Sequence, residues 1–214
     1  MPIQVKICGI NHPEALTAAL AGGVRYVGFV FYPRSPRYVV PAMAAELARM
    51  VPTGVRTVGL FVSPSDAVLD DVVGQVPLDC LQLHDDDPPE RLRAIRQRFA
   101  LPVIKAFRVG APADLERVDG YLGIADVLLF DARPPADPAA LPGGNGLAFD
   151  WRLLAGRSWP RPWMLSGGLT PENLGEAVAA TGARLVDVSS GVEDRPGHKD
   201  PERIRAFLAT AAGL

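Results

Sequence analysis

The sequence predicts an α/β fold and, within that class, a single small (β/α)₈ barrel of the TIM type with short loops over residues 1–214. Three observations predict it. Short apolar segments recur along the whole chain, segments with helical spacing separate them, and glycine-bearing loops follow the last three strands. Because 214 residues are enough to close one large core, we expect one domain.

Eight short segments rich in apolar and β-branched residues are expected to be strands. They are apolar on both faces, which is typical of parallel strands buried between other layers. In order they are residues 5–8, 26–31, 57–62, 80–84, 103–108, 127–131, 163–166 and 185–189.

Segments with helical spacing separate these strands. A capping side chain before a proline marks the helix starts at Thr170-Pro171 and Asp200-Pro201. The helix expected in residues 150–156 is the shortest. The other apolar stripes are Leu16/Ala19/Leu20, Met43/Leu47/Met50, Val68/Val72/Val76, Leu92/Ile95/Phe99, Leu115/Val118/Leu122, Leu174/Val178 and Ile204/Phe207/Leu208/Ala211.

Eight such units fit either a closed barrel or an open doubly wound sheet. An open dinucleotide-binding sheet carries Gly-x-Gly-x-x-Gly after its first strand, but residues 8–12 here read CGINH. The glycines instead follow the sixth, seventh and eighth strands, where barrels commonly bind phosphate. The pattern therefore favours the closed barrel.

Composition excludes several kinds of partner. The 22 Lys and Arg nearly balance the 24 Asp and Glu, so no basic field is expected to hold a nucleic acid. The longest apolar stretch, residues 24–32, contains Arg25 and is shorter than the about 20 residues of a membrane helix. Residues 1–6 do not resemble a signal peptide. We expect a cytoplasmic protein with no nucleic-acid or membrane partner.

The first strand places a cysteine at the mouth of the predicted barrel. Side-chain alternation puts Lys6 and Cys8 on one face and Val5 and Ile7 on the other. Cys8 thus faces the C-terminal mouth, where barrel active sites lie. Its thiol could act as a base if nearby positive charge, such as Lys6, lowered its pKa. Cys80 begins its strand and is expected to be buried and inert at the other end.

Acidic residues close two later strands. Asp131 ends an apolar run, where it could cap a loop, pair with an Arg, or act as a general acid with a raised pKa in a partly dry pocket. Asp187 poses the same choice. In the loop after the second strand, Arg34 and Arg37 lie among prolines, and we expect one of them to reach the site and bind a substrate carboxylate.

Three glycine-bearing loops, residues 142–146, 166–169 and 189–192, follow the last three strands. Glycine lets the backbone approach a ligand, and backbone N–H groups can then bind an anion. Each loop alone could merely make a turn, but three on one rim favour a phosphate site. The stretch between Ser190 and Asp200 leaves room for a short extra helix pointing at that site.

The fourth strand ends with Gln82 and His84 on one face, followed by Asp85, Asp86 and Asp87. A metal site would need converging oxygens, whereas consecutive residues mostly point apart. We therefore expect no metal site there but a solvated loop that adds negative charge to the next helix start. His12 and His198 are also expected in loops.

Six fragments in order together resemble the phosphoribosylanthranilate isomerase family, and the match runs from the first strand to the last helix. They are residues 6–9 (KICG), 28–38 (GFVFYPRSPRY), 81–84 (LQLH), 143–146 (GGNG) with 149–151 (FDW), 165–169 (LSGGL) with 171–173 (PEN), and 186–193 (VDVSSGVE) with 196–197 (PG) and 199–200 (KD).

The resemblance implies a reaction that uses no cofactor and no metal. It is the Amadori rearrangement of N-(5-phosphoribosyl)anthranilate to 1-(2-carboxyphenylamino)-1-deoxyribulose 5-phosphate in tryptophan biosynthesis, by general acid/base catalysis. By this resemblance, Asp131 is the acid, Cys8 the base, and Arg37 holds the anthranilate carboxylate. The implied contacts to the rest of this small phosphorylated substrate are Gly144, Gly146, Ser166, Gly167, Gly168, Asp187, Ser189, Ser190 and Gly191.

The sequence departs from the family pattern at two positions. Asp85 stands where a glycine is usual, and its carboxylate could repel an anionic substrate. Asn145 stands where Thr or Ser is usual, and it still offers a donor.

Two other functions stay open. Indole-3-glycerol-phosphate synthase would need a lysine acid, for which Lys105 is the candidate. A non-catalytic, regulatory sugar-phosphate-binding barrel would be marked by loss of Cys8 or Asp131, and both are present. The sequence leaves monomer and homodimer equally open.

Overall fold

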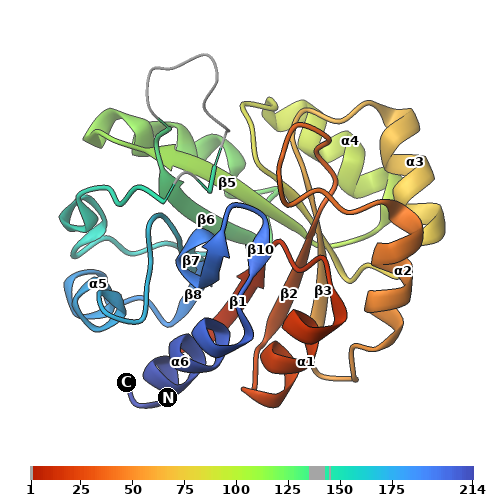
Figure 1. The fold of residues 1–214 in the computed structure, drawn as a ribbon. Helices are drawn as coiled ribbons and strands as arrows, with labels where there is room; N and C mark the ends of the chain where they lie inside the picture. Colours follow the sequence, from red (N-terminus) through yellow and green to blue (C-terminus); the bar gives the residue numbers. More distant parts are fainter. Residues whose placement is uncertain (1, 135–142, 145) are drawn as a thin grey trace.

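The computed structural model describes residues 2–134, 143–144 and 146–214. Eight parallel strands form a closed barrel in chain order, with β8 pairing back onto β1 (Figure 1). The predicted fold class is therefore confirmed. The strands are β1 Gln4–Cys8, β2 Tyr26–Val30, β3 Arg56–Phe61, β4 Cys80–Leu83, β5 Val103–Val109, β6 Val127–Ala132, β7 Trp163–Leu165 and β8 Leu185–Val188.

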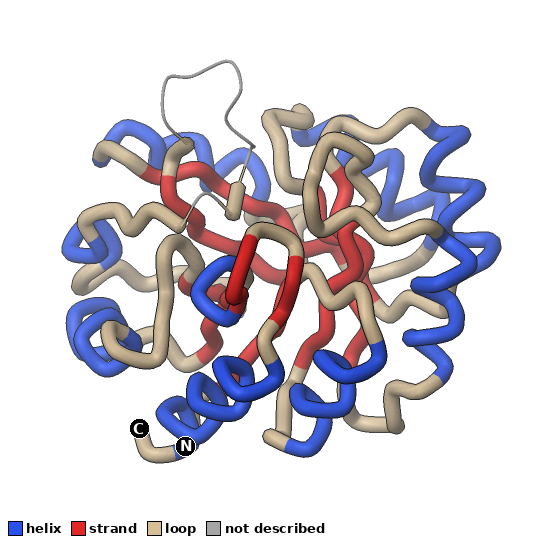
Figure 2. The backbone as a smooth tube through the Cα atoms, in the orientation of Figure 1, coloured by secondary structure: helices blue, strands red, loops and turns tan. Residues whose placement is uncertain are grey.

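Helices surround this barrel, and Figure 2 shows the strands at the centre with the helices outside them. Four α-helices begin with a proline in the first turn, where its fixed φ suits the helix and its missing N–H is not needed. The α-helices are α1 Pro13–Ala21, α2 Pro41–Arg49, α3 Asp66–Gln75, α4 Pro89–Phe99, α5 Leu174–Thr181 and α6 Pro201–Ala212, and the 3₁₀ helices are η1 Pro112–Tyr121, η2 Trp151–Leu154 and η3 Ser190–Val192.

The structure departs from the predicted elements at two crossovers. After β5 the chain forms the 3₁₀ helix η1, and the Asp114 carboxylate accepts the N–H groups of Gly110 and Ala111 at its start, both at 2.8 Å. After β8 the expected extra helix is only the single turn η3. An antiparallel hairpin follows, formed by β9 Glu193–Arg195 and β10 His198–Lys199, so His198 lies in a strand and not in a loop.

Successive side chains of each strand point alternately outward and inward, so each strand contributes to two cores. Outward residues such as Val27, Phe29 and Phe130 pack against the helices in the larger core, and burial of each contributes about 1.5–3 kcal/mol. Inward residues fill the N-terminal half of the barrel with an apolar layer. That layer consists of Tyr26, Val58, Cys80, Ile104, Ala106, Leu129, Met164 and Leu185.

The C-terminal half of the interior is different, because polar side chains from several strands replace the apolar layer. Lys6, Gln82, Asp131 and Asp187 are all buried there. Since parallel strands end at the same edge of the sheet, these side chains meet at one mouth.

Among the described residues, none of the helices combines the length and the apolar character that a membrane span requires.

Candidate active site

A pocket opens at this mouth, and it gathers residues from strands far apart in the sequence. Cys8 from β1, Asp131 from β6 and Arg37 from the loop after β2 all line it. Of the other predicted contacts, Gly191 lines the adjoining depression. The remaining ones line the pocket itself: Gly144, Gly146, Ser166, Gly167, Gly168, Asp187, Ser189 and Ser190.

Cys8 lies beside a buried ion pair, in which Lys6 Nζ donates to Asp187 Oδ1 at 2.8 Å. Burial acts against the Lys6 charge, but Asp187 and Cys8 outweigh it, so the pKa of Lys6 is raised. For Cys8, burial raises the pKa more than the Lys6 charge lowers it. The unliganded pocket therefore holds a thiol whose pKa is raised, not lowered as catalysis by a thiolate would favour.

Gly28 makes room for this pair of groups. It lies directly opposite Cys8 in the β1–β2 register. A Cβ at this position would lie 3.1 Å from Lys6 Nζ and 3.2 Å from Cys8 Sγ. A side chain at this position would displace the Lys6 ammonium and the Cys8 thiol, so glycine leaves the space that both groups occupy.

Asp131 faces His84, which follows β4 on the same face as Gln82. His84 is 6% exposed, and its Nε2 lies 3.2 Å from Asp131 Oδ2, although the angles are not those of a hydrogen bond. His84 Nδ1 lies 3.1 Å from Gln82 Nε2, while Ala132 N donates to Asp131 Oδ1 at 2.9 Å.

No role in the site was predicted for His84, which lines the pocket together with Gln82. The expectation of a solvated loop was wrong for Asp87, which is buried, and whose pKa burial raises. The signal that could have revealed His84 was its side-chain parity with Gln82, since both continue the inward face of the fourth strand.

Arg37, and not Arg34, reaches the pocket, since Arg34 is exposed and Arg37 is buried. Its Nε and Nη2 donate to the two carboxylate oxygens of Glu193 at 2.7 and 2.8 Å. Lys199 Nζ also donates to Glu193. No role was predicted for Glu193 or Lys199, because Arg37, the partner of Glu193, lies 156 residues before it in the chain.

The unusual Asp85 does not line the pocket. Its carboxylate accepts from Ser63 Oγ at 2.8 Å and from Arg108 Nη2 at 3.0 Å. Burial raises its pKa, but Ser63, the Asp86 N–H and Arg108 outweigh burial, and the pKa is lowered. The charge at this position is therefore paired on the rim and is not presented to a substrate.

The loops after β7 and β8 meet closely at one side of the pocket. A Cβ on Gly191, after β8, would overlap Leu169 O, after β7, and Gly167 and Gly168 have φ of +90° and +63°. Among the described residues, no hydrogen bond uses the N–H of Gly168, Ser190 or Gly191. These backbone N–H groups are thus free to donate hydrogen bonds to an anion.

Two polar side chains in this region already have protein partners. Ser189 Oγ donates to Cys8 O at 3.0 Å, and Ser166 Oγ donates to Asp187 Oδ2 at 3.2 Å. The first bond ties the loop after β8 to β1, which carries the thiol, and the second ties the loop after β7 to β8. Asn145 lies outside the described residues.

Lys105 turns away from the pocket to the outer face of the barrel. Its Nζ donates to Asp85 O and lies 5.8 and 5.5 Å from the ring centroids of Phe107 and Tyr121. The candidate lysine acid of an indole-3-glycerol-phosphate synthase is therefore misplaced. Among the described residues, no three His, Cys, Asp or Glu side chains are grouped to hold a metal ion.

A closed (β/α)₈ barrel with a thiol, a carboxyl group and glycine-rich anion-type loops at one mouth defines the class of barrel enzymes that act on phosphorylated substrates. Comparison with known proteins gives the family. The model of the N-(5'phosphoribosyl)anthranilate (PRA) isomerase family matches residues 5–210. The chain therefore belongs to the phosphoribosylanthranilate isomerase family, and it is an isomerase of tryptophan biosynthesis.

Individual relatives agree along the full length of the chain. An N-(5'-phosphoribosyl)anthranilate isomerase from Rhodospirillum centenum is 65% identical over 214 residues, which are 100% of both chains. The crystal structure of phosphoribosyl anthranilate isomerase from Thermotoga maritima superposes with a TM-score of 0.88 at 39% identity, covering 99% of this chain and 100% of that one.

A further solved phosphoribosyl anthranilate isomerase, in complex with reduced 1-(o-carboxyphenylamino)-1-deoxyribulose 5-phosphate, has a TM-score of 0.83 at 37% identity. The match covers 99% of this chain and 100% of that one.

Proposed function

We propose that this chain converts N-(5-phosphoribosyl)anthranilate into 1-(2-carboxyphenylamino)-1-deoxyribulose 5-phosphate with Cys8 as general base and Asp131 as general acid. The observation that carries the assignment is that both side chains line one pocket together with Arg37. A base, an acid and a carboxylate-binding group are what an Amadori rearrangement of this substrate needs.

The reaction begins at the ribose ring oxygen. Asp131 protonates that oxygen as the bond between it and C1 breaks, and the nitrogen lone pair forms an iminium at C1. The Asp131 carboxyl is placed for this step because it is buried at the mouth and lines the pocket. General acid catalysis of this kind contributes about 10²–10⁴-fold.

The second step moves a proton from carbon. Cys8, as thiolate, removes the proton from C2, and the electron pair of that bond forms the C1–C2 double bond of an enolamine while the iminium is neutralised. Tautomerisation then gives the C2 ketone, so C2 is oxidised and C1 reduced without an external redox partner. Lys6 supports the thiolate because its own pKa is raised and it stays charged.

Substrate binding is assigned to the two ends of the pocket. Arg37 binds the anthranilate carboxylate at one end, since its guanidinium lines the pocket. The N–H groups of Gly168, Ser190 and Gly191 bind the phosphate at the other. The full proposed set of contacts is Arg37, Gly144, Gly146, Ser166, Gly167, Gly168, Asp187, Ser189, Ser190 and Gly191.

We also propose that residues 1–214 act as one domain in the cytoplasm, as a monomer or a homodimer. The two buried cysteines are free, in keeping with a reducing compartment. One solved structure holds mutually generated monomers of the dimeric phosphoribosylanthranilate isomerase from Thermotoga maritima, which supports either assembly.

The test is a continuous fluorescence assay that follows disappearance of phosphoribosylanthranilate with the purified protein. The proposal expects turnover by the wild-type chain, with the histidine-pathway aminoaldose as comparison substrate. A protein that binds phosphoribosylanthranilate without consuming it would instead support the non-catalytic sugar-phosphate-binding alternative.

A further inference from the structure

The Arg37 guanidinium is held on three sides. Both oxygens of Glu193 accept from Nε and Nη2. The alkyl stem passes Gly9, where a Cβ would lie 3.1 Å from Arg37 Cδ. Nη1 lies beside Gly144, where a Cβ would lie 2.6 Å away. Among the described residues Nη1 has no acceptor, and it belongs to a side chain that lines the pocket.

Glu193 is fixed in turn by the hairpin that carries it. Lys199 Nζ, from the opposite strand β10, donates to Oε1, and Gly197 N donates to Oε2 at 3.3 Å. Lys199 also donates to Ser189 O at 3.0 Å and to Ser189 Oγ at 3.1 Å. Both carboxylate oxygens of Glu193 that accept from Arg37 are thus also held within the hairpin, one by Lys199 and the other by Gly197. Lys199 in turn links them to the loop after β8.

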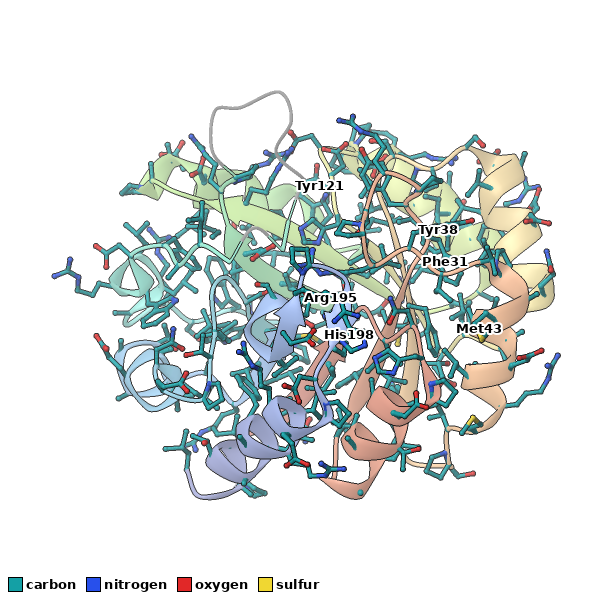
Figure 3. All side chains as sticks on the ribbon, in the orientation of Figure 1. Phe31, Tyr38, Met43, Tyr121, Arg195 and His198 are labelled. Carbon is teal, nitrogen blue, oxygen red and sulfur yellow. The ribbon has the colours of Figure 1, made fainter. Side chains whose placement is uncertain are left out.

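The β9–β10 hairpin also packs against the loop that carries Arg37. Arg195 and His198, labelled in Figure 3, pair across its two strands. At its turn Gly197 has φ +82°, and a Cβ there would overlap Pro36 O. Asn11 Nδ2 donates to Gly197 O at 2.9 Å. The guanidinium, its loop and the hairpin therefore form one packed unit.

The charges of this unit are unbalanced. Arg37 and Lys199 share the single carboxylate of Glu193, and all three side chains are less than a tenth exposed. Burial opposes the charge on Glu193, but Arg37 and Lys199 outweigh it, so its pKa is lowered and it stays ionised. A buried cation without its own anion is unfavourable, so a ligand carboxylate at Nη1 would complete the pairing.

We propose that Glu193 is a positioning residue: held by Lys199, it fixes the Arg37 guanidinium so that Nη1 alone faces the substrate, and it thereby sets selectivity for an aryl group that carries a carboxylate. The inference rests on the proposed function in assigning the carboxylate to Arg37. It adds that the hairpin β9–β10, and not Arg37 alone, creates that selectivity.

The test compares two ligands in direct binding. One is reduced 1-(o-carboxyphenylamino)-1-deoxyribulose 5-phosphate, and the other is its counterpart made from aniline, which lacks the carboxyl group. Wild-type protein is expected to bind the carboxylated ligand more tightly by about tenfold to a hundredfold. In Glu193→Gln this ratio falls to about twofold, while Kd of the aniline ligand changes by less than about twofold.

Control variants separate positioning from folding. Asp194→Asn removes a neighbouring carboxylate on the exposed side of the same hairpin and is expected to keep the wild-type ratio. In an Arg37→Gln background, Glu193→Gln is expected to have no further effect on the ratio. If Glu193→Gln does not fold, Glu193→Asp keeps the charge but is too short for both partners, and it is expected to lower the ratio less.

Three results overturn the inference. A Glu193→Gln protein that keeps the wild-type ratio means that Arg37 needs no positioning by Glu193. Equal weakening of both ligands means that Glu193 is only structural. A wild-type protein that does not distinguish the ligands overturns the assignment of the carboxylate to Arg37, and this inference with it, yet leaves turnover in the fluorescence assay intact.

Discussion

The two ends of the barrel interior come from the same strands but differ in chemistry. On β6 the inward side chain is Leu129 near the N-terminal end and Asp131 near the C-terminal end, and on β8 the corresponding pair is Leu185 and Asp187. The apolar end packs without polar partners, whereas at the mouth Lys6 and Asp187 pair with each other. The difference shows one end specialised for stability and the other for binding and chemistry.

One cysteine lies at each end of the barrel interior, and burial raises the pKa of both. Cys80 lies in the apolar layer, where Arg56 lowers its pKa less than burial raises it. Cys8 lies beside Lys6 and lines the pocket. Burial and a nearby cation are thus common to both thiols, and what separates them is access to a ligand.

The largest expected effect is loss of the thiol at the mouth. Cys8→Ala should lower kcat by about 10³–10⁴-fold, since it removes the proposed base, while Kd for a phosphate-bearing ligand changes by less than about tenfold. The matched control Cys80→Ala should leave kcat unchanged and lower the free energy of unfolding by about 1–2 kcal/mol. Steady-state kinetics and urea unfolding measure both, and a Cys8→Ala protein with wild-type kcat would remove Cys8 from the mechanism.

Replacing the acid at the mouth should have the next largest effect. Asp131→Asn keeps the shape but cannot donate the carboxyl proton, so we expect kcat to fall by about 10²–10³-fold. Asp85→Gly, which restores the glycine usual in the family, is the control. Because Asp85 is paired with Ser63 and Arg108, it should leave kcat within about threefold. A larger change in Asp85→Gly would show that this carboxylate acts on the substrate after all.

A methyl group beside the thiol tests how tightly the mouth is built. Gly28→Ala would press on Lys6 Nζ and Cys8 Sγ, so we expect kcat/KM to fall by about tenfold to a hundredfold. Gly74→Ala in α3, where a Cβ meets nothing within 4 Å, should keep activity and raise the free energy of unfolding by about 0.5–1 kcal/mol. Equal activity of the two variants would falsify the account of Gly28.

The pH profile gives the smallest effect. The base must be the thiolate, and burial raises the pKa of Cys8, so the active fraction of the free enzyme grows as pH rises toward that pKa. We expect kcat/KM to increase by up to about tenfold per unit between about pH 7 and pH 9. The Cys80→Ala protein should show the same profile. A profile that is flat over this range would mean that Cys8 is already ionised or is not the base.

Much of the barrel could be predicted from the sequence, because apolar runs and helical stripes report burial locally. The 3₁₀ geometry of η1 could not, because its buried residues Leu115, Val118 and Tyr121 recur every three positions, a spacing that suits an α-helix as well as a 3₁₀ helix. The hairpin after β8 could not either, because its position depends on contacts of Gly197 with Pro36 and Asn11, which lie far away in the sequence.

The site divides in the same way. Cys8, Asp131 and Arg37 were predictable from their places at strand ends and from family resemblance, and all three line the pocket. His84 and Glu193 were missed as site residues. Side-chain parity places His84 on the inward face with Gln82, but only the fold brings it to Asp131. Glu193 is defined by Arg37, 156 residues away, and its own neighbours in sequence carry no trace of that partner.

Alternation along the strands and the spacing of apolar residues determined the barrel and the end at which its chemistry gathers, because both are properties of short stretches of chain. Only tertiary structure decided that burial leaves the Cys8 thiol with a raised pKa, that Asp131 faces His84, and that Glu193 aims Arg37. Those outcomes depend on desolvation and on charges brought together across the closed barrel, and neither exists until the strands have met.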